Sequence, residues 1–188
     1  MEAGQIRKYT VDEFFALPEG ERYELIEGQL YPLYDMAEPP RIHQELVMRL
    51  SNAILNHIDA NQGDCRVYPA PFGVRLSESA DTVVEPDITV ICDKDKLTDK
   101  GCTGAPDWIL EIVSKSNPEH DYLEKCRLYL KAGVREYWIV NPMDRSVTVY
   151  FEDRPYIPRS FTFEERVQAH LFPELVIDFP GIVKRTEL

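Results

Sequence analysis

The sequence predicts one α/β domain spanning residues 1–188, and three observations lead to that prediction. The chain of 188 residues is long enough for one substantial hydrophobic core and short for two. Two segments around residues 88 and 110 are apolar on both faces, which is typical of buried central strands. Apolar residues recur every four positions between residues 40 and 60, which indicates an amphipathic helix.

The N-terminal part predicts a short helix followed by a β-hairpin. Thr10 and Glu13 have the spacing of a capping box, and the helix that they begin should end near Pro18. The segment that follows, RYELIEGQLYPL, has two short β-prone runs on either side of Glu27 and Gly28. Glycine tolerates positive φ, so an acidic residue followed by glycine between two such runs indicates a hairpin turn.

The middle of the chain predicts the long helix and the central strands. The helix presents one apolar stripe, formed by Leu46, Leu50, Ile54 and Ile58. One or two strands are expected between Cys65 and Leu76. Residues 88–91 form a nearly continuous β-branched run, and residues 106–114 are apolar apart from single acidic positions. Both of these segments are expected to be buried central strands.

The C-terminal part predicts one more helix and an antiparallel pair of strands. Asn117 is a plausible cap, Pro118 fits the first helical position, and Gly133 fits the end of the helix. The segments REYWIVNP and RSVTVYFE read as strands joined by a turn at residues 142–144. Residues 157–179 are expected to be further strand or loop.

Composition and charge narrow the possible function classes. No apolar run approaches the length of a membrane helix, and the N-terminus lacks the apolar core of a signal peptide, so a cytoplasmic protein without membrane contact is expected. The formal charge of −12 argues against broad nonspecific affinity for nucleic acid. Residues 94–135 nevertheless hold eight basic and seven acidic residues, a local balance that is compatible with a phosphate substrate.

Several motifs are missing from the sequence. Glycine-rich phosphate loops and the GxSxG nucleophile elbow are absent, so nucleotide-cofactor and serine-hydrolase chemistry lose their main support. The four cysteines form no CxxC pair and no zinc-site spacing with histidine. Because the chain shows no export signal, these cysteines are expected to be free or buried thiols and not disulfides: Cys65, Cys92, Cys102 and Cys126.

Two acidic residues lie in segments that otherwise belong to the core. Asp87 begins the strand PDITVI and Glu111 lies inside WILEIV. A buried carboxylate needs a cation, a hydrogen-bonding partner or a raised pKa. Two carboxylates facing the same side of adjacent strands provide hard oxygen ligands suited to Mg²⁺ or Mn²⁺. The simpler alternatives are that Asp87 is a cap or turn residue and that Glu111 forms an ion pair at a sheet edge.

A series of ordered motifs runs through residues 23–150: YELIEGQL, Ile42 with His43, EPDITVI, WILEIVSKSN, the D-x-x-x-K-x-x-x-Y pattern of Asp121, Lys125 and Tyr129, and GVREYWIVNP. The series closely resembles the bacterial Uma-type family of putative restriction endonucleases, formerly a domain of unknown function, which belongs to the PD-(D/E)XK nuclease superfamily. This resemblance implies a restriction-endonuclease-like core, in which a mixed β-sheet is flanked by helices.

The resemblance also implies a set of site residues. Carried over by position, Asp87 and Glu111 would be metal ligands, and the backbone carbonyl of Ile112 a third one. The superfamily lysine should follow two residues after the motif glutamate, where this chain has Val113. We expect Lys125 to replace it, with Lys115 as the second choice. The alternative for Lys125 is a surface ion pair with Asp121, four residues before it.

Two further residues of the motifs are candidates for the site. Glu24 could approach the metal as a ligand or a base, or it could lie on a solvent-exposed strand face. His43 could contact a phosphate, or it could hold a loop by hydrogen bonding. The aromatic residues of the motifs are expected to be core residues and not a base-stacking surface: Trp108, Tyr129, Tyr137 and Trp138.

The leading hypothesis is therefore a Mg²⁺- or Mn²⁺-dependent nuclease that hydrolyses phosphodiester bonds, with DNA favoured over RNA. A homodimer is expected on mechanism alone, because a symmetric dimer acts most easily on both strands of a duplex. The alternative, motivated by Val113 and the charge of −12, is a nuclease-fold protein that acts as a binding or regulatory module without catalysis.

Overall fold

The computed structural model describes residues 7–18, 22–33, 40–114 and 124–186. Two six-stranded sheets form most of it, together with one two-stranded sheet. The central sheet has the spatial order β12 (Arg154–Thr162), β11 (Ser146–Phe151), β10 (Glu136–Asn141), β9 (Trp108–Ile112), β6 (Ile88–Ile91) and β3 (Arg66–Pro69). Within it β9 and β10 run parallel and the other neighbouring strands run antiparallel.

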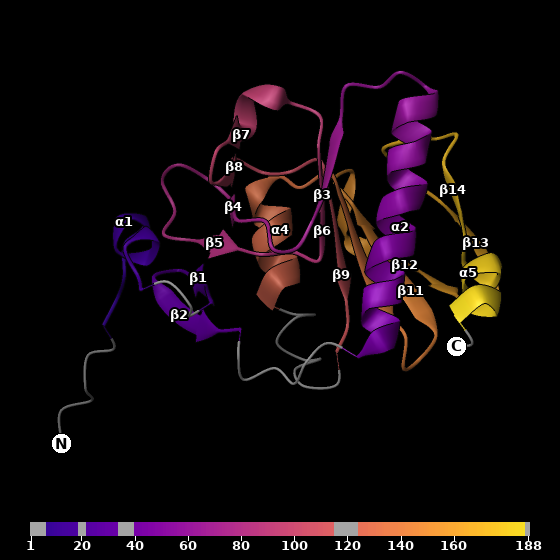
Figure 1. Cartoon of the computed structure of the whole chain (residues 1–188), viewed down its shortest axis with the longest axis horizontal. Coiled ribbons are helices and arrows are strands. Elements are labelled where there is room, and N and C mark those ends of the chain that lie inside the picture. Colours follow the sequence, from indigo (N-terminus) through magenta and orange to yellow (C-terminus); the bar gives the residue numbers. More distant parts are fainter. Residues whose placement is uncertain (1–6, 19–21, 34–39, 115–123, 187–188) are drawn as a thin grey trace.

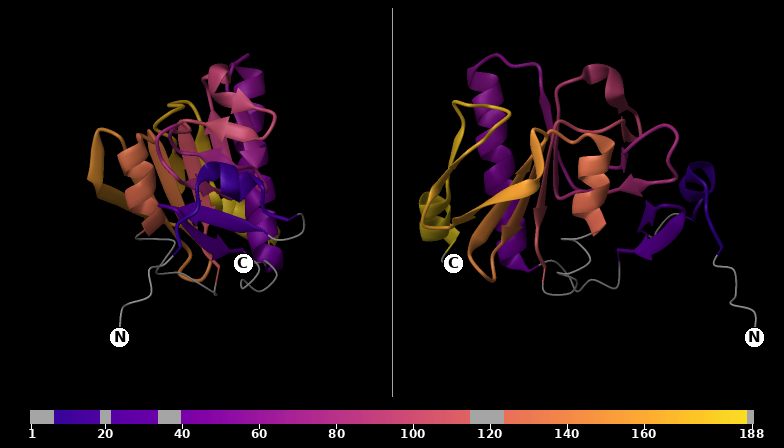
Figure 2. Two further views of the ribbon diagram at one scale, coloured as in Figure 1. Left: turned by 90° about the vertical axis from the view of Figure 1, so that its left-hand side faces the viewer. Right: turned by 180° about the vertical axis from the view of Figure 1, so that it is seen from behind.

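Helices cover both faces of the central sheet, as Figures 1 and 2 show for α2 (Arg41–Ala60) and α4 (Cys126–Ala132). The predicted apolar stripe of α2 is fully buried and packs in one cluster with the even-numbered side chains of β9. The odd-numbered side chains Ile109 and Val113 pack instead with α4. The expected mixed sheet flanked by helices is thus confirmed, and the strand alternation decides which face each β9 side chain reaches.

The N-terminal sheet lies on the α4 side of the central sheet (Figure 1). Its spatial order is β2 (Gln29–Pro32), β1 (Tyr23–Ile26), β5 (Val83–Val84), β4 (Val74–Arg75), β8 (Gly101–Thr103) and β7 (Leu97–Thr98). The predicted hairpin joins β1 to β2 through Glu27 and Gly28, both with positive φ, of 49° and 84°. Positive φ at both central residues is the signature of the type I′ turn, so the sequence signal is explained.

The short N-terminal helix and the end of the second flanking helix also follow the sequence. α1 (Val11–Phe15) begins with the complete capping box of Thr10 and Glu13. α4 ends at Gly133, whose φ of 93° is the left-handed conformation that glycine favours. The predicted start of that helix, at Asn117 and Pro118, lies outside the described residues.

The C-terminal part has more regular structure than the sequence indicated. β13 (Arg166–Gln168) pairs with β14 (Val176–Asp178), and α5 (Phe179–Thr186) follows without interruption. The sequence analysis expected strand or loop for residues 157–179 and made no prediction for the residues that follow. Packing explains the difference, because Phe179 is buried in the cluster that α2 forms with the sheet. No helix in the described ranges has the length and apolar character to cross a membrane.

The expectation of four free thiols is wrong for one pair. Cys65 and Cys92 form a disulfide. β3 and β6 are antiparallel, and Arg66 lies opposite Ile91. One step further along this register, Cys65 lies opposite Cys92. The separation of 27 positions between the two cysteines hides this register in the sequence. Cys102 and Cys126 are free and buried, as expected.

Candidate active site

Asp87 and Glu111 lie next to each other at one end of the central sheet. Ile88 of β6 is opposite Leu110 of β9, and one more step of this antiparallel register brings Asp87 opposite Glu111. Directly opposed residues of antiparallel strands point to the same face. The backbone N–H of Ile112 donates a 2.7 Å hydrogen bond to Oδ2 of Asp87, which holds the two strands together there.

Lys125 brings a positive charge to these carboxylates from the beginning of α4. Its Nζ lies 2.9 Å from Oε1 of Glu24 and 3.3 Å from Oε1 of Glu111. Only 5–8% of each of these three side chains is exposed. A surface ion pair is therefore not the setting of Lys125. Asp121 and Lys115, the other two residues proposed for this region, lie outside the described residues.

Glu24 reaches the site from β1 and is not on an exposed strand face. The same Oε1 atom that contacts Lys125 also accepts a 2.9 Å hydrogen bond from the backbone N–H of Glu85. These two donors hold the Glu24 carboxylate against the lysine. Glu24 of the hairpin, Glu111 of the central sheet and Lys125 of α4 thus form one charged cluster, with Asp87 beside Glu111.

His43 lies in the first turn of α2 and contacts Asp87. Its Nε2 is 3.2 Å from Oδ2 of the carboxylate. Burial alone lowers the pKa of His43, but the hydrogen bond with Asp87 and the charge of Asp87 outweigh burial and raise the pKa above its ordinary value. The protonated imidazole is thereby favoured, and its contact with Oδ2 orients the Asp87 carboxylate.

Tyr129 completes the cluster in a way that the sequence analysis missed. Its hydroxyl donates a 2.6 Å hydrogen bond to Oε1 of Glu111. Burial and the nearby glutamates raise the pKa of Tyr129 well above 10, so the hydroxyl keeps its proton and remains a donor. The sequence analysis assigned this residue to the core, which accounts for its burial only. The available signal was its spacing of four residues after Lys125, because residues i and i+4 share a helix face.

We expect Tyr129→Phe to lower both stability and activity. The change removes one donor from a buried carboxylate, which costs about 1–3 kcal/mol. Urea denaturation measures that loss, and a phosphodiesterase assay with metal should show a decrease of roughly tenfold if Tyr129 positions Glu111. A suitable control is Tyr68→Phe, which removes a hydroxyl from a ring stacked 4.3 Å from Phe72. Equal behaviour of the two variants would contradict a positioning role for Tyr129.

The donor set of this cluster suits a hard divalent cation. Asp87 receives its two described hydrogen bonds at Oδ2, and 19% of its side chain remains exposed. Mg²⁺ commonly takes one or two carboxylates and keeps water as its other ligands. In the described part of the chain no three His, Cys, Asp or Glu side chains are arranged as a metal cage. Asp87 and Glu111 nevertheless place two carboxylates on one face of the sheet, which matches the one or two that Mg²⁺ commonly takes.

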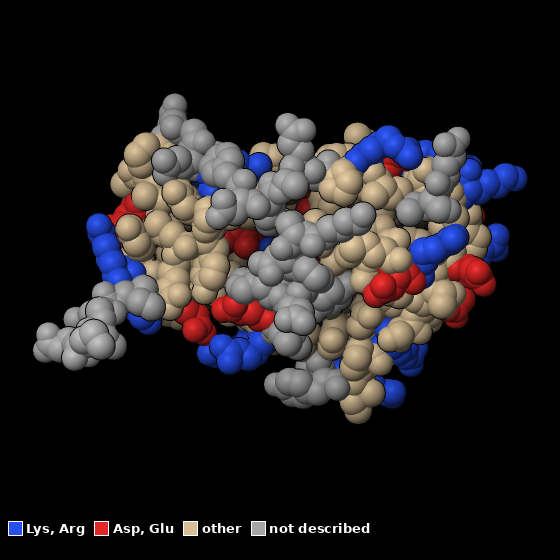
Figure 3. Space-filling view, turned by 90° about the horizontal axis from the view of Figure 1, so that it is seen from below, with Lys and Arg blue, Asp and Glu red and all other residues tan. Residues whose placement is uncertain are grey.

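The face around this end of the sheet carries charges of both signs. Figure 3 shows the molecule from the side on which α2 begins and β9 ends, with basic and acidic side chains interspersed around the rim. The described Lys and Arg side chains seen in this view form no continuous basic area.

Comparison with known proteins agrees with the fold and with the family resemblance. The family described as "Uma2: Putative restriction endonuclease" matches residues 11–180. A crystal structure of a putative nuclease belonging to DUF820, from Anabaena variabilis, superposes with a TM-score of 0.75 at 22% sequence identity. The match covers 94% of this chain and 98% of that one, and at this identity the likeness concerns the fold. None of the curated proteins compared with the chain matches it.

Proposed function

The chain belongs to the Uma2 family of putative restriction endonucleases, and we propose that it is a nuclease that hydrolyses phosphodiester bonds with the help of a divalent cation. The observation that supports this most strongly is the buried contact of Lys125 with Glu24 and Glu111, beside Asp87. A lysine and carboxylates at the end of a central sheet form a site that can hold a cation and stabilise an anionic transition state.

The position of Lys125 also supports the proposal that it takes the place of the missing superfamily lysine. Val113 follows Glu111 by two residues and lies on the same face of the strand, packed against Cys126 and its neighbours on α4. A lysine at position 113 would therefore point towards the space that α4 occupies. Lys125 approaches the same face of β9 from that helix. This arrangement favours an active site over a scaffold that has lost its catalytic lysine.

Each residue of the cluster has a proposed role. Asp87, Glu111 and the carbonyl of Ile112 would hold Mg²⁺ or Mn²⁺, and the bound cation would polarise the scissile phosphate and lower the pKa of a coordinated water. Lys125 offsets the negative charge that develops on the phosphate, because its ammonium group is fixed by Glu24 and Glu111. His43 keeps the Asp87 carboxylate in one orientation. Glu24 orients Lys125.

DNA is the substrate that we propose, acted on by a homodimer. A restriction-type reaction cuts two strands of opposite direction, and a twofold dimer presents two equivalent sites in that relation. Sedimentation of the purified protein distinguishes a dimer from a monomer of 21.8 kDa.

The direct test is to incubate the protein with DNA and RNA substrates in the presence of Mg²⁺, of Mn²⁺ and of EDTA. We expect cleavage that requires the cation, with DNA cut faster than RNA, because the carboxylates alone cannot activate water. Calorimetric titration with Mn²⁺ separates this proposal from a noncatalytic module. Nucleic-acid or protein binding without any cation binding and without cleavage would favour the module.

A further inference from the structure

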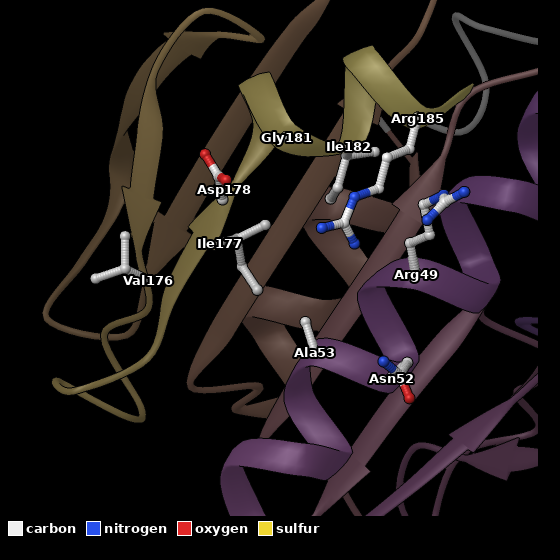
Figure 4. Close-up of a pocket in the computed structure, with 9 residues that line it drawn as sticks. All are labelled: Arg49, Asn52, Ala53, Val176, Ile177, Asp178, Gly181, Ile182 and Arg185. Carbon is white, nitrogen blue, oxygen red and sulfur yellow. The ribbon is translucent and has the colours of Figure 1, made fainter. Parts of the chain in front are cut away.

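A second polar site lies between α2 and α5, apart from the carboxylate cluster (Figure 4). It is a cavity of about 280 Å³ that is open to solvent. Figure 4 shows that Arg49 and Asn52 reach it from α2 and that Arg185 reaches it from the last turn of α5. Two arginines thus line one concave surface of a protein whose formal charge is −12.

Within the described ranges neither arginine has an anionic partner. Arg49 and Arg185 form no ion pair there, although most other arginines of these ranges do. The Nε atom of Arg49 is buried and has no hydrogen-bond partner. A buried donor without an acceptor costs about 1–3 kcal/mol, and two neighbouring like charges add repulsion. An anion in the cavity would offset the repulsion between the two guanidinium groups.

The one acidic residue that lines the cavity is engaged elsewhere. Asp178 forms an ion pair of 3.2 Å with Arg166, on the neighbouring strand β13. Its carboxylate also lies against the first turn of α5, so closely that a Cβ on Gly181 would overlap Oδ2. Glycine at position 181 therefore allows Asp178 to remain at the beginning of the helix. The two arginines are left for a ligand from outside.

The position of the cavity indicates which anion this is. Arg49 follows His43 by six residues on the same helix, which is about 9 Å along the helix axis. His43 contacts Asp87, so α2 reaches both the cavity and the proposed cleavage site, whereas Lys125 approaches that site from the other face of the sheet. Guanidinium groups offer paired N–H donors that match phosphate oxygens, and the Asn52 amide adds another donor.

We propose that Arg49, Arg185 and Asn52 bind a second phosphate of the nucleic-acid backbone, at another point along the strand from the phosphate that is cleaved, on the side of α2 that faces α5. The inference rests on the proposed nuclease function and adds a substrate-binding residue set to it. Contacts of this kind position a strand without reading its sequence. They also supply affinity to a protein whose overall charge opposes binding.

The test compares two double variants that remove the same charge. Arg49→Gln with Arg185→Gln removes both guanidinium groups that line the cavity. Arg154→Gln with Arg159→Gln removes two exposed arginines from β12, where Arg154 lies opposite Phe151, at the far end of the strands from Glu111. Fluorescence anisotropy with a short labelled DNA duplex, in Ca²⁺ at several salt concentrations, gives the affinity and its salt dependence. Inorganic phosphate is titrated in parallel by NMR.

We expect the cavity variant to bind the duplex roughly tenfold more weakly and to lower the slope of log K against log salt by about 0.9, the value for one lost phosphate contact. The β12 variant should change neither quantity. Thermal unfolding of the cavity variant should match wild type or exceed it, because no internal ion pair is lost. These results together support the inference.

A cavity variant that binds the duplex like wild type would overturn the inference without touching the nuclease proposal. If that variant also loses inorganic phosphate, the cavity holds a free anion and not a phosphate of the nucleic acid. If the wild-type protein neither binds nor cleaves any nucleic acid, the proposed function itself fails, and the inference fails with it.

Discussion

Replacing Lys125 by methionine is expected to abolish cleavage and to destabilise the protein by roughly 3–5 kcal/mol, the usual cost of breaking a buried ion pair by removing one partner. The change leaves Glu24 and Glu111 buried with less than a tenth of each side chain exposed, and it removes the ammonium group between them. Activity should fall by a factor of about 10²–10³, because the group that offsets charge on the phosphate is gone.

Urea denaturation at neutral pH and a cleavage assay measure these two effects. Lys131→Met is the matched control, because Lys131 lies on the same helix but is exposed, so its loss should change stability by at most about 0.5 kcal/mol. Adding Glu24→Gln to Lys125→Met should recover part of the lost stability, since one uncompensated charge is removed. A Lys125→Met protein that is as stable and as active as Lys131→Met would refute the proposed role.

Asp87→Asn and Glu111→Gln are each expected to remove cation binding and cleavage while keeping the shape of the side chain. A neutral amide is a much weaker ligand for a hard cation than a carboxylate. We expect the rate to fall by at least a factor of about 10³, which corresponds to about 4 kcal/mol of transition-state stabilisation. Titration calorimetry with Mn²⁺ and the cleavage assay follow the two losses separately.

The control for these variants is Asp64→Asn. The side chain of Asp64 is 83% exposed and pairs with Lys94 away from the cluster, so both cation binding and cleavage should stay at the wild-type level. Cleavage that persists in Asp87→Asn and in Glu111→Gln would exclude these carboxylates as the centre of the reaction. Loss of cleavage with intact cation binding would move the metal site to other residues.

Local sequence patterns predicted much of the fold because their physical causes act over a few residues. The capping box at Thr10, the turn at Glu27 and Gly28, and the end of α4 at Gly133 each depend on backbone geometry within one turn. The four-residue repeat of α2 depends on the helical period, and its apolar stripe is buried as expected. Patterns of this kind do not say which element lies against which.

The same distinction applies to the candidate site. An unusual charge within an apolar strand was enough to select Asp87 and Glu111, and the family motif was enough to select Lys125. The sequence did not decide whether Glu24 lies on an exposed strand face or at the site, and it assigned Tyr129 to the core. Packing of the hairpin and α4 against the central sheet buries Glu24 beside the lysine and turns the Tyr129 hydroxyl to Glu111.

By itself, then, the sequence determined most elements of this α/β protein before its C-terminal part, and it selected the carboxylates at the end of the central strands, because periodicity, capping and misplaced charge are local properties. Only the tertiary structure decided the partners: the lysine between two buried glutamates, the disulfide of Cys65 with Cys92, and the cavity shared by Arg49 and Arg185. These contacts join residues from 14 to more than 100 positions apart. Strand register and helix packing bring them together, and neither can be read from a short stretch of chain.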